Sequence, residues 1–313
     1  MESNKPVLMQ GLLQIADPKI WIASTVPMLA GAAVAWAFTR NFRPLSVLWF
    51  FLAVIAVYLV ETAKNALNEV VDYISGVDPG VDDVHRTPFS GGKKTIVDGK
   101  LDLTQNAYIA LACFSAAAVI GILIVIFAEP KVFWVGLAGF VLSVAYSLPP
   151  FKLCYKGLGE IAVGIAFGPV ILMGIYVLLT GRFDLLPLLA SLPIAFVIMN
   201  VLVINQYPDF ETDRDHGKKN WVVMLGKRRS VFVFGGLFTL SYLSCIATAV
   251  YAGNPVWLLY LATIPIAVKA VKNCYKNYNN IQGLIASNAA TVKIYQLLGL
   301  SLAASAILDG LVF

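Results

Sequence analysis

Two clusters of asparagine and acidic residues lie at the ends of strongly apolar segments of this chain. They occupy residues 68–78 and 205–213, and they contain Asn68, Asp72, Asp78, Asn205, Asp209 and Asp213. Carboxylate oxygens with few nitrogen or sulfur ligands nearby favour a hard cation such as Mg²⁺, which is commonly shared with substrate phosphates. The residue types therefore predict a cation site that binds a diphosphate.

Bringing the two clusters together would create strong repulsion among the carboxylates unless cations were present. The four acids that would meet around one small volume are Asp72, Asp78, Asp209 and Asp213. The outer phosphate oxygens would be held by basic residues, for which the candidates are Arg86, Lys93 or Lys94, Lys152 and Lys218. Among these, Lys218 and its neighbour Lys219 are interpreted mainly as ordinary loop charges.

Each cluster alone also has a purely structural interpretation. Acid-rich loops between helices are commonly just solvated, and asparagines within membranes often hydrogen-bond neighbouring helices. Two clusters with matched Asn-x-x-x-Asp spacing, on the same side of the membrane, favour the functional interpretation.

The elements that must position these clusters are membrane-spanning helices. Hydrophobic residues make up 59% of the 313 residues and charged residues only 13%, far from the soluble average. Runs near the roughly 20 residues needed to cross a bilayer occur at residues 19–38, 46–70, 104–128, 132–148, 159–180, 186–207, 230–252, 255–271 and 291–312. We predict an all-α polytopic membrane protein, a single domain over residues 1–313, in which nine transmembrane helices surround a central cavity.

The basic residues are distributed unevenly among the connections between these spans. The N-terminus and the even-numbered connections carry 17 Lys and Arg residues, whereas the odd-numbered connections carry 4. Because Lys and Arg concentrate in cytoplasmic loops, we predict that the N-terminus and both acidic clusters are cytoplasmic. The net charge of +5 is then explained by topology, and no nucleic-acid partner is expected.

Helical spacing sharpens the first cluster. Steps of 4, 3 and 4 residues place Glu61, Asn65, Asn68 and Asp72 on one helix face. An ionised side chain near mid-bilayer costs at least about 2.5–3.5 kcal/mol, so this face must line the bundle interior or a watery cavity. The second cluster repeats the spacing, although Pro208 indicates that its helix is kinked or ends there.

The segments 68–78 and 205–213 resemble the two aspartate-rich motifs of the UbiA superfamily of intramembrane prenyltransferases. Residues 85–92 (HRTPFSGG), 146–160 and 209–226 resemble the branch that prenylates 1,4-dihydroxy-2-naphthoate in menaquinone biosynthesis. Two departures stand out, because Glu69 replaces the more usual aspartate and Lys93-Lys94-Thr95 replaces smaller or more neutral residues.

The resemblance implies electrophilic transfer of a polyprenyl group from an allylic polyprenyl diphosphate to an aromatic acceptor within the lipid bilayer, assisted by two Mg²⁺ ions. It implies as metal ligands Asn68, Asp72 and Asp78 on one side and Asp209 and Asp213 on the other. It implies catalytic roles for Asp72, Asp209, Arg86, Lys152 and Tyr146, and diphosphate binding by Asn68, Asn205, Arg86 and Lys152. Tyr146 also has an alternative role, since aromatic residues at helix ends often serve as interfacial anchors.

Other functions remain open on the sequence. The same chemistry serves acceptors such as 4-hydroxybenzoate, homogentisate and glyceryl lipids, and some relatives cyclise the donor. A cation-coupled transporter could also place Asn and Asp at broken helix ends, although such sites lie near the bilayer midplane. A purely structural membrane subunit offers no reason for two matched acid clusters.

Overall fold

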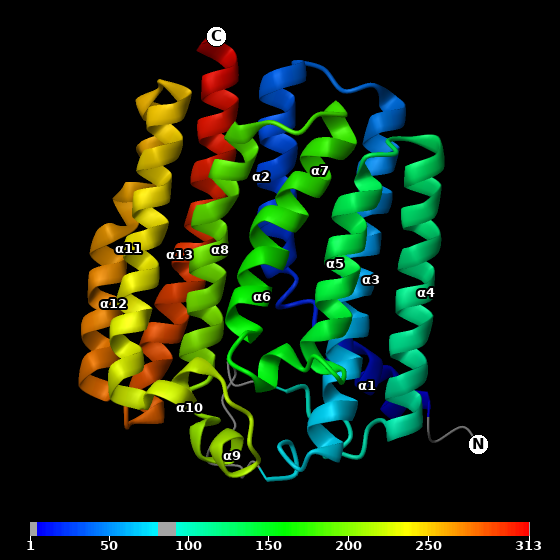
Figure 1. Ribbon diagram of the computed structural model, residues 1–313, viewed down its shortest axis with the longest axis vertical. Helices are drawn as coiled ribbons and strands as arrows, with labels where there is room; N and C mark the ends of the chain where they lie inside the picture. Colours follow the sequence, from blue (N-terminus) through cyan, green and yellow to red (C-terminus); the bar gives the residue numbers. More distant parts are fainter. Residues whose placement is uncertain (1–4, 81–91, 313) are drawn as a thin grey trace.

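The computed structural model describes residues 5–80 and 92–312, and it is a bundle of long helices lying side by side (Figure 1). The long elements are α2 (Ile22–Thr39), α3 (Pro44–Ile74), α4 (Leu103–Phe127), α5 (Val132–Ser147), α6 (Gly159–Ile165) continued by η4 (Ala166–Val170) and α7 (Ile171–Thr180), α8 (Leu185–Asn205), α11 (Lys227–Ala252), η5 (Pro255–Thr263) continued by α12 (Ile264–Asn277), and α13 (Ile281–Val312). The all-α polytopic fold is therefore confirmed.

Eight of these segments, within the described part of the chain, are long and apolar enough to cross a membrane. The remaining predicted span corresponds to α5, which is apolar but has only 16 residues. Every predicted span thus has a helical counterpart, although α5 is short for an upright crossing of about 30 Å.

The last helix begins ten residues before the predicted span. Its first turns contain Ser287 and Asn288, which lowered the apparent hydrophobicity of that stretch. Both side chains are buried: Ser287 Oγ donates to the Ala270 carbonyl at 2.9 Å and Asn288 Nδ2 donates to Asn205 Oδ1 at 2.8 Å. Polar residues that bond neighbouring helices are therefore compatible with a buried helix.

The segment from α6 to α7 bends through the π-helical turn η4, which contains Pro169. Proline has no amide hydrogen to donate, and a π turn is a common way to accommodate such a break. Next to it, Gly168 lies against α8, where an added Cβ would come within 2.7 Å of Ala195 Cβ. Glycine at this position therefore permits the close approach of the two helices.

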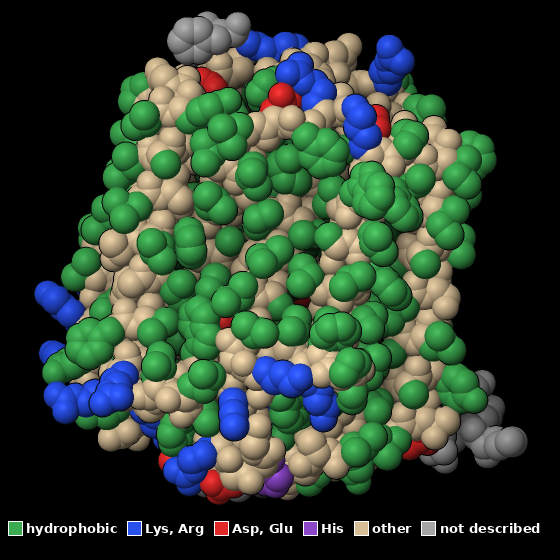
Figure 2. All heavy atoms as spheres, in the orientation of Figure 1, with side chains coloured by type: hydrophobic (Ala, Val, Ile, Leu, Met, Phe, Trp, Pro, Cys, Tyr) green, Lys and Arg blue, Asp and Glu red, His purple; other side chains and the backbone are tan. Residues whose placement is uncertain are grey.

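The helices differ in how deeply they lie in the bundle. In its most apolar stretch α8 is 67% buried, whereas α3 is only 11% buried. Hydrophobic side chains cover the middle of the face shown in Figure 2, and Lys and Arg gather near its two ends. This is the surface expected of a protein embedded in lipid, since apolar residues face the hydrocarbon.

The polar loops gather at one end of the bundle, the lower end in Figure 1. This end carries α1 (Lys5–Ala16), the short turn η3 (Leu153–Tyr155), and the short helices α9 (Phe210–Asp215) and α10 (Trp221–Leu225). The end of α3 and the end of α8 both lead into these loops. The fold therefore brings the two acidic clusters to the same end of the molecule, as predicted.

Candidate active site

Asp72 lies in the last turn of α3 and is almost completely buried, with 1% of its surface exposed. Two groups from distant loops pair with its carboxylate. Tyr155 Oη donates to Asp72 Oδ1 at 2.6 Å, and Lys218 Nζ donates to Asp72 Oδ2 at 2.8 Å. A buried carboxylate needs such partners, because an unpaired buried charge is costly.

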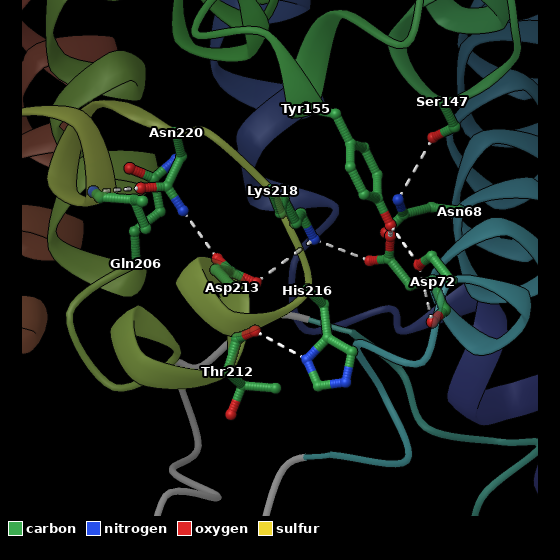
Figure 3. A network of polar contacts seen from close by, with 12 residues as sticks. Asn68, Asp72, Ser147, Tyr155, Gln206, Thr212, Asp213, His216, Lys218 and Asn220 are labelled. Carbon is green, nitrogen blue, oxygen red and sulfur yellow. Dashed lines mark hydrogen bonds and ion pairs between the residues drawn. The ribbon is translucent and has the colours of Figure 1, made fainter.

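Lys218 joins the two acidic clusters (Figure 3). Its ammonium nitrogen lies 2.8 Å from Asp72 Oδ2 and 3.9 Å from Asp213 Oδ1. Burial by itself lowers the pKa of Lys218, but the charges of Asp72 and Asp213 outweigh it and raise the pKa well above its usual value. The ammonium therefore stays charged between the two clusters.

The interpretation of Lys218 as an ordinary loop charge is therefore wrong. Only 17% of its side chain is exposed, and the turn after α9 directs it inward, with its backbone amide donating to the Asp213 carbonyl at 2.7 Å. Sequence reasoning had one available signal, namely the position of Lys218 five residues after Asp213. Its neighbour Lys219 is exposed, as expected.

Tyr155 is a second site residue that residue-by-residue reasoning missed. Besides Asp72, its hydroxyl contacts Ser75 Oγ at 2.6 Å. Lys152 Nζ lies 4.7 Å from the centroid of its ring and Lys218 Nζ lies 5.5 Å from it, distances at which a cation is attracted to an aromatic face. The structure thus brings the predicted Lys152 to the edge of the acidic site, where its role in diphosphate binding stays a prediction.

Asp78 reaches the site from the loop after α3, and it is buried. Its backbone amide donates to the Asp72 carbonyl at 3.2 Å. Among the described residues no group donates a hydrogen bond to Asp78 Oδ2. Burial, followed by the charges of Asp72 and Glu69, raises the pKa of Asp78 to about 8. This orphaned oxygen is the kind of group that a cation would satisfy.

Glu69 serves a structural purpose. Its carboxylate accepts hydrogen bonds from the backbone amides of Lys94 and Thr95 at 2.5 and 2.8 Å. The longer side chain of glutamate therefore fastens the 93–95 loop to α3. The two departures from the family pattern, Glu69 and the Lys93-Lys94-Thr95 segment, are consequently in contact with each other.

The residues of the second cluster point to different neighbours. Asp213 is buried, and its Oδ2 accepts from Asn220 Nδ2 at 2.6 Å. Burial together with the charges of Asp209 and Asp72 raises the pKa of Asp213 to about 7, even though Lys218 lowers it. Asp209 is also buried, in the turn before α9. Asn205 faces α13, where its Oδ1 accepts from Asn288, so its predicted contact with diphosphate stays a prediction.

The remaining predicted residues lie in different places. Asn68 Nδ2 donates to Ser147 Oγ at 3.2 Å, one turn of α3 before Asp72. Tyr146 lines an intramembrane cavity next to Ser147, and its predicted role stays a prediction. Arg86 lies outside the described residues. His216 is exposed and its Nδ1 pairs with the Thr212 carbonyl at 2.9 Å, which fits an ordinary loop residue.

The cavity lies beside the site and has a volume of about 550 Å³. Its walls come from α3, α4, α5 and the α6–η4–α7 segment, with Ser24 of α2 added, and they are almost entirely apolar. A space of this kind suits a hydrocarbon chain and excludes water from its interior. The cavity reaches Lys64 on α3, which lies about two helical turns before Asp72 of the acidic site.

Residues 24–287 match the sequence profile of the UbiA prenyltransferase family. The chain belongs to the UbiA prenyltransferase family. The match covers most of the chain, including both acidic clusters, and it makes the protein a transferase of the prenyltransferase type.

Curated UbiA relatives are similar over most of their length. The 1,4-dihydroxy-2-naphthoate octaprenyltransferase of Bacillus subtilis is 24% identical over 275 residues, which cover 88% of this chain and 85% of the relative. The 2-carboxy-1,4-naphthoquinone phytyltransferase of Synechocystis is 26% identical, with 87% and 84% covered. The UbiA prenyltransferase domain-containing protein 1 of Dictyostelium discoideum is 25% identical, with 88% and 82% covered.

The UbiA fold is also shared with solved structures. A UbiA homologue from Archaeoglobus fulgidus bound to GPP and Mg²⁺ superposes with a TM-score of 0.66 at 15% identity, covering 94% of this chain and 99% of that one. The apo structure of a UbiA homologue from Aeropyrum pernix has the same TM-score, 0.66, and covers 88% and 96%. At this level of identity the likeness establishes the fold.

The positions of the acidic side chains in this UbiA site bear on how it could hold a cation. Within the described ranges no three His, Cys, Asp or Glu side chains are grouped closely enough to hold a metal ion. Instead, Lys218 stands between Asp72 and Asp213. The donor set nevertheless fits Mg²⁺, because it consists of carboxylates, includes the orphaned Asp78 Oδ2, and offers oxygen ligands throughout.

Proposed function

We propose that this UbiA-family protein transfers a polyprenyl group from an allylic polyprenyl diphosphate to 1,4-dihydroxy-2-naphthoate. The observation that carries the proposal is the meeting of two buried acidic clusters, from segments far apart in the sequence, at one end of the bundle. An apolar intramembrane cavity reaches Lys64, about two turns of α3 before Asp72. The acidic end suits a diphosphate with its cations, and the cavity suits an isoprenoid chain. The naphthoate acceptor rests on the names of the similar curated proteins.

Mg²⁺ would be held by Asn68, Asp72, Asp78, Asp209 and Asp213, and we expect two ions. When bound, Mg²⁺ supplies positive charge that neutralises the diphosphate and makes it a better leaving group. A role for Mg²⁺ is supported by one solved structure of similar fold, which is described as bound to GPP and Mg²⁺.

The cations of the chain would stabilise the leaving diphosphate. Negative charge grows on it as the allylic C–O bond breaks, so positive groups at this position stabilise the transition state more than the ground state. Lys218 already lies between the clusters, and Lys152 lies 4.7 Å from the centre of the Tyr155 ring at their edge. We propose that both ammonium groups, joined by Arg86, act where this charge develops.

The apolar cavity protects the allylic cation that remains. Its wall excludes water, which would otherwise capture the cation. The ring carbon of the acceptor that bears the carboxylate then forms the new C–C bond, and carbon dioxide leaves without the bonding electron pair, which restores the aromatic ring. We place this chemistry on the cytoplasmic side, because the basic residues concentrate in the connections on that side.

A transfer assay tests the proposal. Purified protein receives Mg²⁺, a polyprenyl diphosphate and a panel of acceptors that includes 1,4-dihydroxy-2-naphthoate, 4-hydroxybenzoate and homogentisate, and the products are measured by mass spectrometry. A decarboxylated prenyl-naphthoquinol that disappears with EDTA is expected. Metal-dependent diphosphate release without this product would refute the acceptor, and no metal-dependent release would refute prenyl transfer itself.

A further inference from the structure

The polar side chains of the apolar cavity are few. They are Ser24, Glu61, Lys64, Ser143 and Tyr146. Glu61 and Lys64 are the charged side chains in the cavity wall, and both belong to α3. Charged groups inside a membrane protein are costly and usually mark a functional site.

This polar pair lies between the acidic site and the apolar part of the cavity. Lys64 precedes Asn68 by four residues and Asp72 by eight, which corresponds to about 6 and 12 Å along the axis of α3. Tyr146, which faces Lys64, is adjacent to Ser147, the partner of Asn68. A molecule held at Lys64 would therefore lie next to a diphosphate bound at the acidic clusters.

Glu61 and Lys64 differ in their hydrogen-bond partners. Glu61 Oε2 accepts a hydrogen bond from Ser24 Oγ on α2. Lys64 Nζ lies 5.7 Å from the centroid of the Tyr146 ring. Among residues 5–80 and 92–312, no acceptor forms a hydrogen bond or an ion pair of 4.0 Å or less with Lys64 Nζ. An ammonium group lining an apolar cavity has three donors to offer to an incoming anion.

We propose that Lys64 is the anchor for the carboxylate of the aromatic acceptor. This inference rests on the proposed function and extends it by naming the residue that binds the carboxylate of the small aromatic acceptor. Lys64 pairs with the carboxylate, while Glu61, three residues before Lys64 on α3, is engaged by Ser24 on the side away from the acidic clusters. The ring is thereby held at the level of Tyr146, where the allylic carbon of a bound donor would face it.

The anchor also accounts for selectivity. A neutral acceptor offers Lys64 no anionic hydrogen-bond partner, so the site would lose the charge-assisted hydrogen bond that a carboxylate makes. Acceptors that carry a carboxylate are therefore bound in preference to neutral phenols or glyceryl lipids. Because the donor is held through its diphosphate at the acidic clusters, its binding is independent of Lys64.

Direct binding in nanodiscs tests the anchor. The probe is 1-hydroxy-2-naphthoate, which is fluorescent and resists oxidation, and its matched neutral counterpart is 1-naphthol. Lys64→Met should weaken binding of the carboxylate at least tenfold and leave 1-naphthol within about twofold. Lys64→Arg should retain binding of the carboxylate, because it keeps the positive charge. The control is Lys293→Met, which removes an exposed lysine of α13 and should change neither affinity.

A second measurement separates this inference from the proposed function. Stabilisation of each variant by Mg²⁺ with geranyl thiolodiphosphate, an unreactive donor analogue, is followed by thermal unfolding. If the wild type is stabilised and Lys64→Met binds the carboxylate as tightly as the wild type, the anchor is refuted while the donor site stands. If the wild type itself shows no stabilisation, the donor site of the proposed function fails. If Lys64→Met loses donor stabilisation as well, Lys64 supports the fold and the anchor is overturned.

Discussion

Lys218 Nζ lies 2.8 Å from Asp72 Oδ2, although 146 residues separate the two in the sequence. The same ammonium lies 3.9 Å from Asp213 Oδ1. Lys218 therefore places a positive charge between the two acidic clusters. Mg²⁺ would compete with it for the same carboxylates.

Lys218→Met should destabilise the metal-free protein. Removing one partner of a buried ion pair leaves the other charge uncompensated, which costs about 3–5 kcal/mol when the pair is fully buried, and somewhat less here because Lys218 keeps contact with solvent. We expect a lower unfolding temperature without Mg²⁺ and recovery of much of the difference with Mg²⁺. The control is Lys219→Met, at the exposed neighbouring position. An unchanged unfolding temperature for Lys218→Met would contradict the bridging role.

Asp72→Asn should abolish prenyl transfer while the protein stays folded in the membrane. The amide keeps the shape of the side chain but removes the charge that pairs with a cation, and we expect a loss of at least about 100-fold, the size seen when one electrostatic group of an active site is removed. Asp209→Asn should behave alike. The matched control is Asp215→Asn, an exposed acid of α9. Turnover near the wild-type rate in either site variant would refute the assignment.

The affinity for Mg²⁺ should rise with pH. In the unfolded chain the carboxyls of Asp78 and Asp213 ionise near pH 4, whereas in the folded metal-free protein their pKa values are raised to about 8 and about 7. Between the pKa values of the unfolded chain and those of the folded protein, the folded state binds more protons than the unfolded state. The free energy of unfolding therefore falls as the pH rises through this range. A cation must displace those protons, and its binding is therefore weaker at low pH.

This dependence is measured by titrating Mg²⁺ at about pH 6, 7 and 8 and following the unfolding temperature. The midpoint of the titration should move to lower Mg²⁺ concentration at each step, by up to about tenfold per pH unit for each proton released. Asp78→Asn should flatten the dependence, because one of the two protonated carboxyls is gone. A midpoint that does not move with pH would show that neither proton is displaced.

Tyr155→Phe should cost about 1–2 kcal/mol of stability in the metal-free protein. The change removes the hydroxyl that donates to Asp72 Oδ1 and contacts Ser75 Oγ, and a hydrogen bond to a charged group contributes about 1.5–3 kcal/mol. The ring remains, so the contacts with Lys152 and Lys218 persist. Chemical denaturation measures the difference, with Tyr275→Phe, an exposed tyrosine, as the control. Equal stability of the two variants would contradict the role of the hydroxyl.

The fold could be predicted from the sequence because it follows from local rules. Runs of apolar residues long enough to cross a bilayer must become helices, since no water is available to bond the backbone. The predicted spans accordingly match the observed helices, and the main error lies at the start of α13, where Ser287 and Asn288 made a buried helix look polar. The acidic clusters were recognisable by the same reasoning, because apolar segments retain acids only at a cost.

The sequence also predicted that one face of α3 points inward, but it could not say what each residue on that face would meet. Glu61 meets Ser24 of α2, whereas Asn65 donates to the Ile15 carbonyl of α1 at 3.1 Å. Farther along, Asn68 meets Ser147 of α5. Helical periodicity fixes the direction of a side chain and leaves its neighbour undetermined.

Only the tertiary structure placed Lys218 between the clusters, assigned Glu69 to the 93–95 loop and turned Asn205 towards α13. Each of these contacts joins segments far apart in the chain, so no local spacing encodes it. The sequence by itself determined that oxygen ligands would gather at one end of a membrane bundle, because composition and periodicity are local properties. Tertiary packing decides that the ammonium of Lys218 lies between these ligands, because the loops that carry them are far apart in the sequence.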